Sequence, residues 1–133
     1  MPVYKMLGAA REEIPVYVSS GVLPTVDAYV AESLDAKAKG YRGYKLHPPG
    51  MVEGGKVEMD IAAYKAVRAA VGPDFPLMAD PVIGHDYEEA LKVGRELEKL
   101  DFLWLEEPVL DVDFNSLRKL REKLDIPIIA TEV

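Results

Sequence analysis

Short apolar or β-branched segments alternate with amphipathic segments along the whole chain. The apolar segments cover residues 14–20, 41–47, 75–81, 101–108 and 126–133. The segments between them carry apolar side chains near helical spacing and cover residues 25–39, 60–71, 86–100 and 115–124. Glycine or proline occurs in most of the connections. This alternation predicts five strands and four helices in an α/β fold, with a parallel sheet and right-handed crossovers.

Two aspartates are predicted to begin helices. Asp60 precedes a run of apolar residues at helical spacing, so it is expected to be the N-cap of the second helix. Asp86 is followed three residues later by Glu89, which is the pattern of a capping box, so the third helix is expected to begin there.

Composition limits the class of protein and its partners. At 133 residues, with 49% apolar and 29% charged residues, the chain suits one globular domain. The net charge of −7 argues against a nucleic-acid partner, because phosphate binding requires a basic surface. The sequence contains no run of about 20 apolar residues, as a membrane span would need, and it does not open with a signal peptide. The absence of cysteine excludes disulfides and fits a cytoplasmic protein.

Chemically active residues lie at or near the ends of four of the apolar segments. His47, Asp80, Glu106 and Glu132 follow one another in steps of 33, 26 and 26 residues, each the length of one strand–helix unit. Equivalent strand ends lie side by side in a parallel sheet. We therefore expect the three carboxylates on one rim, the carboxyl end of the sheet, where (β/α)₈ barrels place their active sites.

The three carboxylates predict a cation at this rim. Each of Asp80, Glu106 and Glu132 alone is equally well explained as a turn residue or helix cap, but three acids at successive strand ends would repel one another without a cation. Oxygen ligands without cysteine favour Mg²⁺ over Zn²⁺. Because neighbouring strand residues face opposite ways, Glu106 is expected to face the metal, with Glu107 facing outward or supporting the site from behind.

Four motifs carry a family resemblance. "YKLHPPG", "LMADP", "WLEEP" and "IATEV", in this order, resemble the enolase superfamily in its mandelate racemase/muconate lactonizing enzyme branch. The resemblance implies that Asp80, Glu106 and Glu132 bind Mg²⁺ at the ends of barrel strands three, four and five. It also implies a partial (β/α)₈ TIM barrel over residues 14–133, preceded by a linker over residues 1–13. The N-terminal capping domain and the last barrel strands would then be absent.

The resemblance also assigns catalytic residues. Lys45 and His47 match the Lys-x-His motif of strand two, and residues two apart in a strand share one face. In the family chemistry, His47 would remove the proton α to a carboxylate and Lys45 would help the metal stabilise the enediolate. Taken singly, Lys45 could be a solvated strand-end lysine and His47 a loop histidine. His85 could contact substrate on the rim or simply accompany the Asp86 cap.

One departure from the family pattern indicates the kind of substrate. Many relatives have Asp-x-Asn after strand three, whereas Asp80 is followed here by Pro81 and Val82. With the Lys-x-His motif, this favours a small carboxylate or acid-sugar substrate and a dehydratase rather than mandelate racemase itself, with racemisation as the other outcome. The glycine-rich residues 50–55 lack the ending of a P-loop, so a phosphate-binding barrel has little support.

The missing barrel strands bear on activity and assembly. Strands six to eight, and the second acid/base group that the family carries on them, have no counterpart in this sequence. The isolated chain is therefore expected to be inactive and to self-associate as a homo-oligomer through the open barrel face. A non-catalytic half-barrel that self-associates is the alternative interpretation.

Overall fold

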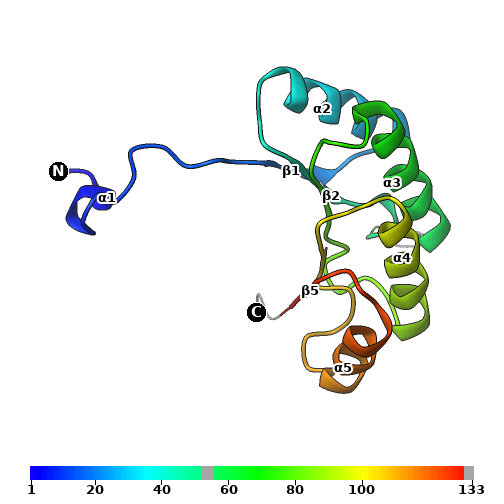
Figure 1. Cartoon of the computed structure of the whole chain (residues 1–133). Coiled ribbons are helices and arrows are strands. Elements are labelled where there is room, and N and C mark those ends of the chain that lie inside the picture. The colour runs from blue at the N-terminus through cyan, green and yellow to red at the C-terminus, as the bar shows by residue number, and fades with distance from the viewer. Residues whose placement is uncertain (52–55, 131–133) are drawn as a thin grey trace.

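A single parallel sheet forms the centre of the molecule (Figure 1). The computed structural model describes residues 1–51 and 56–130. The sheet order is β1-β2-β3-β4-β5, so each strand pairs with the next strand along the chain. The strands are β1 (Val18–Val22), β2 (Tyr44–His47), β3 (Leu77–Ala79), β4 (Leu105–Glu106) and β5 (Ile128–Ile129). This order is that of an opened (β/α) barrel, as predicted.

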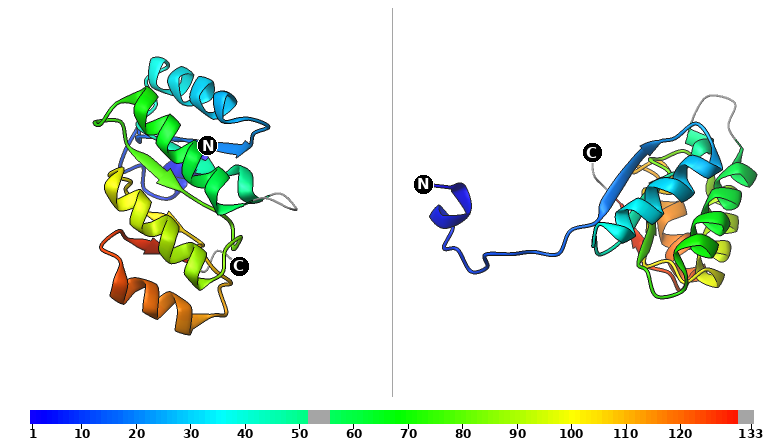
Figure 2. Two further views of the ribbon diagram at one scale, coloured as in Figure 1. Left: turned by 90° about the vertical axis from the view of Figure 1, so that its right-hand side faces the viewer. Right: turned by 90° about the horizontal axis from the view of Figure 1, so that it is seen from above.

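Helices cover one face of this sheet, as the views in Figure 2 show. They are α2 (Val26–Ala38), α3 (Val57–Val71), α4 (Tyr87–Lys99) and α5 (Phe114–Lys123), each connecting two consecutive strands. Within the described residues, no helix packs on the opposite face of the sheet, and none is long and apolar enough to span a membrane.

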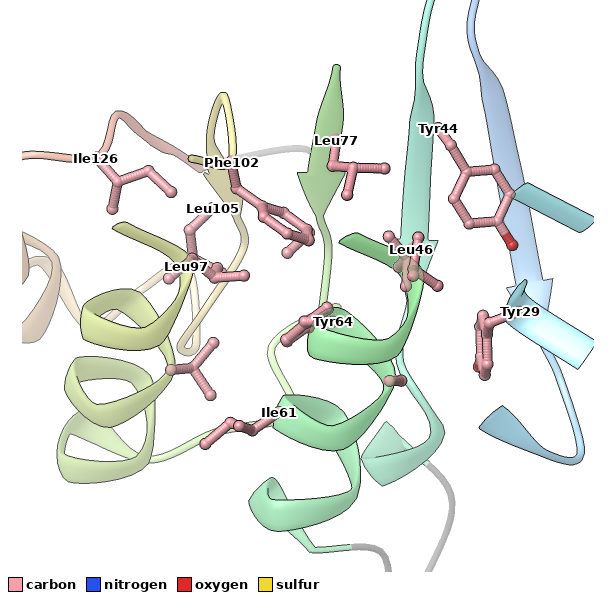
Figure 3. Close-up of a cluster of buried hydrophobic side chains, with 14 of the residues drawn as sticks. Tyr29, Tyr44, Leu46, Ile61, Tyr64, Leu77, Leu97, Phe102, Leu105 and Ile126 are labelled. Atoms are coloured by element: carbon pink, nitrogen blue, oxygen red, sulfur yellow. The ribbon is translucent and has the colours of Figure 1, made fainter. Parts of the chain in front are cut away.

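The hydrophobic core lies between the strands and these helices. Leu46, Leu77 and Leu105 come from three neighbouring strands, and all are fully buried. Figure 3 shows them with Tyr64 of α3 and Leu97 of α4. Because side chains alternate along a strand, the residues next to these leucines point to the other face of the sheet. The core therefore determines which strand residues remain available for chemistry.

Of the two predicted helix caps, the structure confirms Asp86 and contradicts Asp60. Asp86 caps α4 in a complete capping box with Glu89, as predicted. The predicted cap at Asp60 is wrong, because α3 begins earlier, after Lys56, and Asp60 lies inside the first turn. Asp60 is 1% exposed, and its Oδ1 accepts a hydrogen bond from the Gly50 N–H at 2.6 Å. Its carboxylate thus serves the preceding loop, a tertiary role that helix-start patterns do not reveal.

The ends of the chain differ most from the predicted segments. The first strand begins at Val18 rather than at residue 14, and residues before it form an arm that extends away from the sheet (Figure 1). This arm contains a short helix, α1 (Val3–Met6), that was not predicted. A 3₁₀ turn, η1 (Pro49–Met51), occupies the start of the glycine-rich loop, and residues 52–55 lie outside the described residues.

Candidate active site

An ammonium and two carboxylates meet at the carboxyl end of β2, β3 and β4. Lys45 Nζ donates to Asp80 Oδ2 at 2.7 Å and to Glu106 Oε1 at 3.0 Å. The three side chains are 9%, 3% and 13% exposed, respectively. The structure thus brings residues that are 35 and 61 positions apart from Lys45 to one rim, on the face that the helices leave open. The spacing of the strand–helix repeat predicted this position for Asp80 and Glu106.

Asp80 and Glu106 stabilise the positively charged form of Lys45. Burial by itself would lower the pKa of Lys45, but the hydrogen bonds and charges of Asp80 and Glu106 outweigh that effect, so the pKa is raised. In this arrangement each buried charge has a hydrogen-bonded partner of opposite sign. The rim therefore already favours a positive charge between Asp80 and Glu106.

His47 lies beside this group on the same face as Lys45. Its Nε2 is 3.1 Å from Asp80 Oδ2, and its side chain is 22% exposed. Leu46, between the two, points into the core. The i, i+2 rule therefore holds in β2, and an imidazole with access to solvent adjoins the buried charges.

Glu106 has a second anchor that the sequence reasoning missed. Its Oε2 accepts a hydrogen bond from Trp104 Nε1 at 2.9 Å. The Trp104 ring in turn meets the Tyr17 ring edge-on, with centroids 6.0 Å apart. Trp104 and Glu106 are two residues apart in an extended segment, so the same i, i+2 rule that grouped Lys45 and His47 would have found this pair.

Glu107 does not face outward. It is 4% exposed, so of the two predicted alternatives only an internal role is compatible with the structure. Its backbone has a φ of +43°, in the left-handed region that most residues avoid. The Glu107 N–H donates to the Ile129 carbonyl at 2.7 Å, and its own carbonyl accepts from the Ile83 N–H at 2.6 Å. Glu107 thereby ties β4 to β5 and to the loop after β3.

The loop after β3 is strained where it passes the site. Val82 and Ile83 have φ values of +46° and +55°, which are unusual for β-branched residues. The Val82 N–H donates to Asp80 Oδ1 at 3.2 Å, while the other Asp80 oxygen accepts from Lys45. Both oxygens of Asp80 are therefore oriented, one by the strained loop and one by the ammonium.

His85 is turned away from this group and toward α3. Its Nε2 lies 2.8 Å from Asp60 Oδ2, and the side chain is 5% exposed. Within the described residues, no polar contact joins it to Lys45, His47, Asp80 or Glu106. Substrate contact by His85 thus stays a prediction, and the observed role of the ring is to cross-link the loop after β3 to the start of α3.

The residues present fit a divalent cation in part. Asp80 and Glu106 offer oxygen ligands that already enclose a positive charge, and such ligands suit Mg²⁺. Glu132, the third predicted ligand, lies outside the described residues. Over residues 1–51 and 56–130, no cluster of three or more histidine or acidic side chains is close enough to hold a metal. The fit therefore rests on Asp80 and Glu106.

Sequence comparison decides the family. The sequence model of the family described as "Enolase C-terminal domain-like" matches residues 28–133, which is well over half of the chain. The chain belongs to this family. The predicted resemblance to the enolase superfamily is thereby confirmed, and its relatives include dehydratases and racemases.

Individual members of the enolase superfamily are similar over nearly the whole chain. The L-talarate/galactarate dehydratase of Salmonella typhimurium is 34% identical over 100% of this chain and 33% of its own length. The N-succinyl-L-Arg/Lys racemase of Bacillus cereus is 31% identical over 98% of this chain and 34% of its own length. The chain therefore spans about a third of the length of the curated relatives it matches.

A solved structure gives the same fold. The D-glucarate dehydratase of Agrobacterium tumefaciens, crystallised in complex with magnesium, superposes with a TM-score of 0.85 at 38% identity. The alignment covers 96% of this chain and 35% of the dehydratase. The five-stranded sheet thus corresponds to part of an enolase-superfamily barrel.

Proposed function

We propose that this chain carries the metal-binding and proton-abstracting part of an acid-sugar dehydratase or racemase site. The observation that supports this most strongly is the rim itself, where Lys45 joins Asp80 to Glu106 and His47 adjoins Asp80. Buried charges of both signs beside a partly exposed imidazole are typical of a catalytic site. Family membership supports the same assignment.

Mg²⁺ is the cofactor that this proposal requires. Asp80 and Glu106 would bind it, with Glu132 as the third ligand, and the magnesium complex of D-glucarate dehydratase supports this choice. When bound, the ion would act as a Lewis acid on the substrate carboxylate. Lys45 would then be free to turn its ammonium from the ligands toward the same carboxylate.

His47 and Lys45 would have different roles in the proton abstraction. His47 Nε2 takes the proton from the carbon next to the carboxylate, and the electron pair of the broken C–H bond moves into the carboxylate group. The Lys45 ammonium stabilises the charge that develops there. Dehydration then needs loss of a β-hydroxyl, and racemisation needs reprotonation on the other face.

The proposed substrate is a small carboxylate of the acid-sugar type. Relatives that act on talarate, galactarate and arabinonate support it, as does the Asp80-Pro81 variant of the strand-three motif. We also propose that the isolated chain turns over no substrate, because it spans only about a third of these enzymes.

A chimera tests the proposed function. The matching third of the Salmonella typhimurium dehydratase is replaced by this chain, and Mg²⁺-dependent loss of water from galactarate is measured. We expect turnover, with a loss of about 100-fold or more on His47→Asn or Glu106→Gln. Glu122→Gln, an exposed acid on α5, is the matched control and should leave the rate unchanged. A folded chimera with no turnover, or with turnover that survives both substitutions, would contradict the proposal.

The open face of the sheet supports a second proposal, self-association. An apolar hollow on this face is lined by Val16, Tyr17, Met78, Leu103 and Trp104, among others. Val16 and Leu103 are about half exposed, and a second copy of the chain would cover them. We expect light scattering to show a homo-oligomer that Leu103→Glu dissociates. The matched variant Leu34→Glu, at a similarly exposed leucine on α2, should leave it intact. A monomeric wild-type chain would contradict this proposal.

A further inference from the structure

One buried serine in the middle of β1 contacts His47 through two atoms. Ser20 Oγ accepts a hydrogen bond from the His47 backbone N–H at 3.0 Å, and the Ser20 carbonyl oxygen contacts His47 Nδ1. The strand pairs Ser19–Lys45 and Val22–His47 leave one extra residue on the β1 side, which is a bulge. This bulge places the Ser20 carbonyl opposite the imidazole ring.

A buried tyrosine fixes the other side of the His47 backbone. The Tyr29 hydroxyl, in α2, donates to the His47 carbonyl at 2.6 Å and accepts from the Leu23 N–H at 2.9 Å. Burial raises the pKa of Tyr29, so the hydroxyl keeps the proton that it donates. Tyr29 thus cross-links the chain just after β1 to the end of β2, next to the contact between Ser20 and His47.

These contacts determine which ring nitrogen of His47 carries the proton. A carbonyl oxygen can only accept, so a hydrogen bond between the Ser20 carbonyl and the His47 ring places a proton on Nδ1. Asp80 Oδ2 is the competing acceptor at Nε2, but it is 3.1 Å away and already accepts from Lys45 at 2.7 Å. These contacts therefore direct Nδ1 toward Ser20 and turn Nε2 toward the rim.

We propose that Ser20 and Tyr29 are positioning residues that direct Nδ1–H of His47 to the Ser20 carbonyl and thereby turn Nε2 toward the rim. This inference rests on the proposed role of His47 as the base. Neither residue is placed to touch substrate, because both act through the backbone and ring of His47. Ser20 and Tyr29 were not among the residues that the sequence indicated.

Nitrogen-15 NMR tests the tautomer directly. The chain has only two histidines, so a sample labelled with ¹⁵N-histidine gives two imidazole patterns, and His85→Gln assigns the remaining one to His47. At a pH where the ring is neutral, we expect two-bond ¹H–¹⁵N correlations of the Nδ1–H tautomer in the wild type. A predominant Nε2–H tautomer would overturn the proposal.

Three variants test the positioning. Ser20→Ala and Tyr29→Phe keep the Ser20 carbonyl but remove a contact that fixes the His47 backbone against it, so each should raise the ratio of Nε2–H to Nδ1–H. The upper limit is about fivefold, the factor that one net hydrogen bond represents. Ser20→Thr keeps the hydroxyl and should restore the wild-type ratio. Ser33→Ala is the matched control, since this buried serine donates within α2 to Val30.

The outcomes separate this inference from the proposed function. If the folded Ser20→Ala and Tyr29→Phe variants have the same tautomer ratio as Ser33→Ala, the positioning role is contradicted. Should one of these variants fail to fold, as judged by thermal unfolding, the other variant and the wild-type spectrum still decide. The spectra need neither Mg²⁺ nor substrate, so an inactive chimera with an Nδ1–H ring contradicts the proposed function alone.

Discussion

The two faces of the sheet impose opposite requirements on neighbouring residues. In β2, Tyr44 and Leu46 pack into the helix-covered core, while Lys45 and His47 lie with the charges on the open face. The covered face depends on volume and close packing, and the open face depends on balanced charge and hydrogen-bond direction. A strand four residues long thus supplies both fold and chemistry, because consecutive side chains alternate.

The largest expected effect is a cavity on the covered face. Leu77→Ala removes a fully buried side chain and should lower the free energy of unfolding by about 2–5 kcal/mol, measured by urea denaturation. Leu110→Ala, at a leucine that is 57% exposed, should change it by less than about 0.5 kcal/mol. Equal effects for the two variants would show that this face is not the core.

A charge removed from the open face should matter almost as much. Lys45→Met leaves Asp80 and Glu106 buried without their cation, so without Mg²⁺ it should cost about 2–3 kcal/mol in urea denaturation. Added Mg²⁺ should then raise the melting temperature of this variant more than that of the wild type, because the ion replaces the lost charge. Identical Mg²⁺ shifts for both proteins would contradict the charge balance inferred for this face.

Relief of backbone strain at the rim should give a smaller change of opposite sign. Val82→Gly suits the positive φ of this position and should raise the free energy of unfolding by about 1 kcal/mol. Val112→Gly, at an exposed valine for which no positive φ is found, should lower it slightly through backbone entropy. A loss of stability in both variants would mean that the loop after β3 is not strained.

The smallest expected effect lies on the outer surface of the helices. Lys65 and Lys99 hold the pKa of Glu96 down to about 2, below its ordinary value of 4.5, through hydrogen bonds of 2.8 and 2.5 Å. A depressed carboxyl pKa stabilises the fold above pH 4.5, and this stabilisation is lost as the pH falls toward 2. Glu96→Gln should therefore slightly lower the melting temperature at pH 7 but not at pH 2. A difference that persists at pH 2 would contradict this.

The sequence predicted features that depend on repetition along the chain. Regular strand–helix spacing predicted the parallel order of five strands, and it located His47, Asp80 and Glu106 on neighbouring strands. Lys45 was indicated by the Lys-x-His motif of the family resemblance and lies on the same face as His47. The Asp86 cap was also predictable, because a capping box involves residues only three apart.

Features that depend on contacts between distant segments were not predictable. The internal role of Asp60 arises from Gly50 and His85, which belong to other loops. The bulge at Ser20 depends on pairing with β2, and its one local sign, Gly21 inside β1, was predicted to lie in a connection. The left-handed conformation of Glu107 opposes the intrinsic preference of its residue type, and only its contacts with the adjoining loop and strand impose it.

The central claim is that the carboxylates at this rim bind a divalent cation. Isothermal titration calorimetry of the purified chain with Mg²⁺ tests it, with Glu106→Gln as the site variant and Glu122→Gln as an exposed control on α5. We predict saturable binding to the wild type and to Glu122→Gln, weakened at least about tenfold in Glu106→Gln, which corresponds to 1.4 kcal/mol or more. No binding to the wild type, or equal binding to all three proteins, would contradict the account.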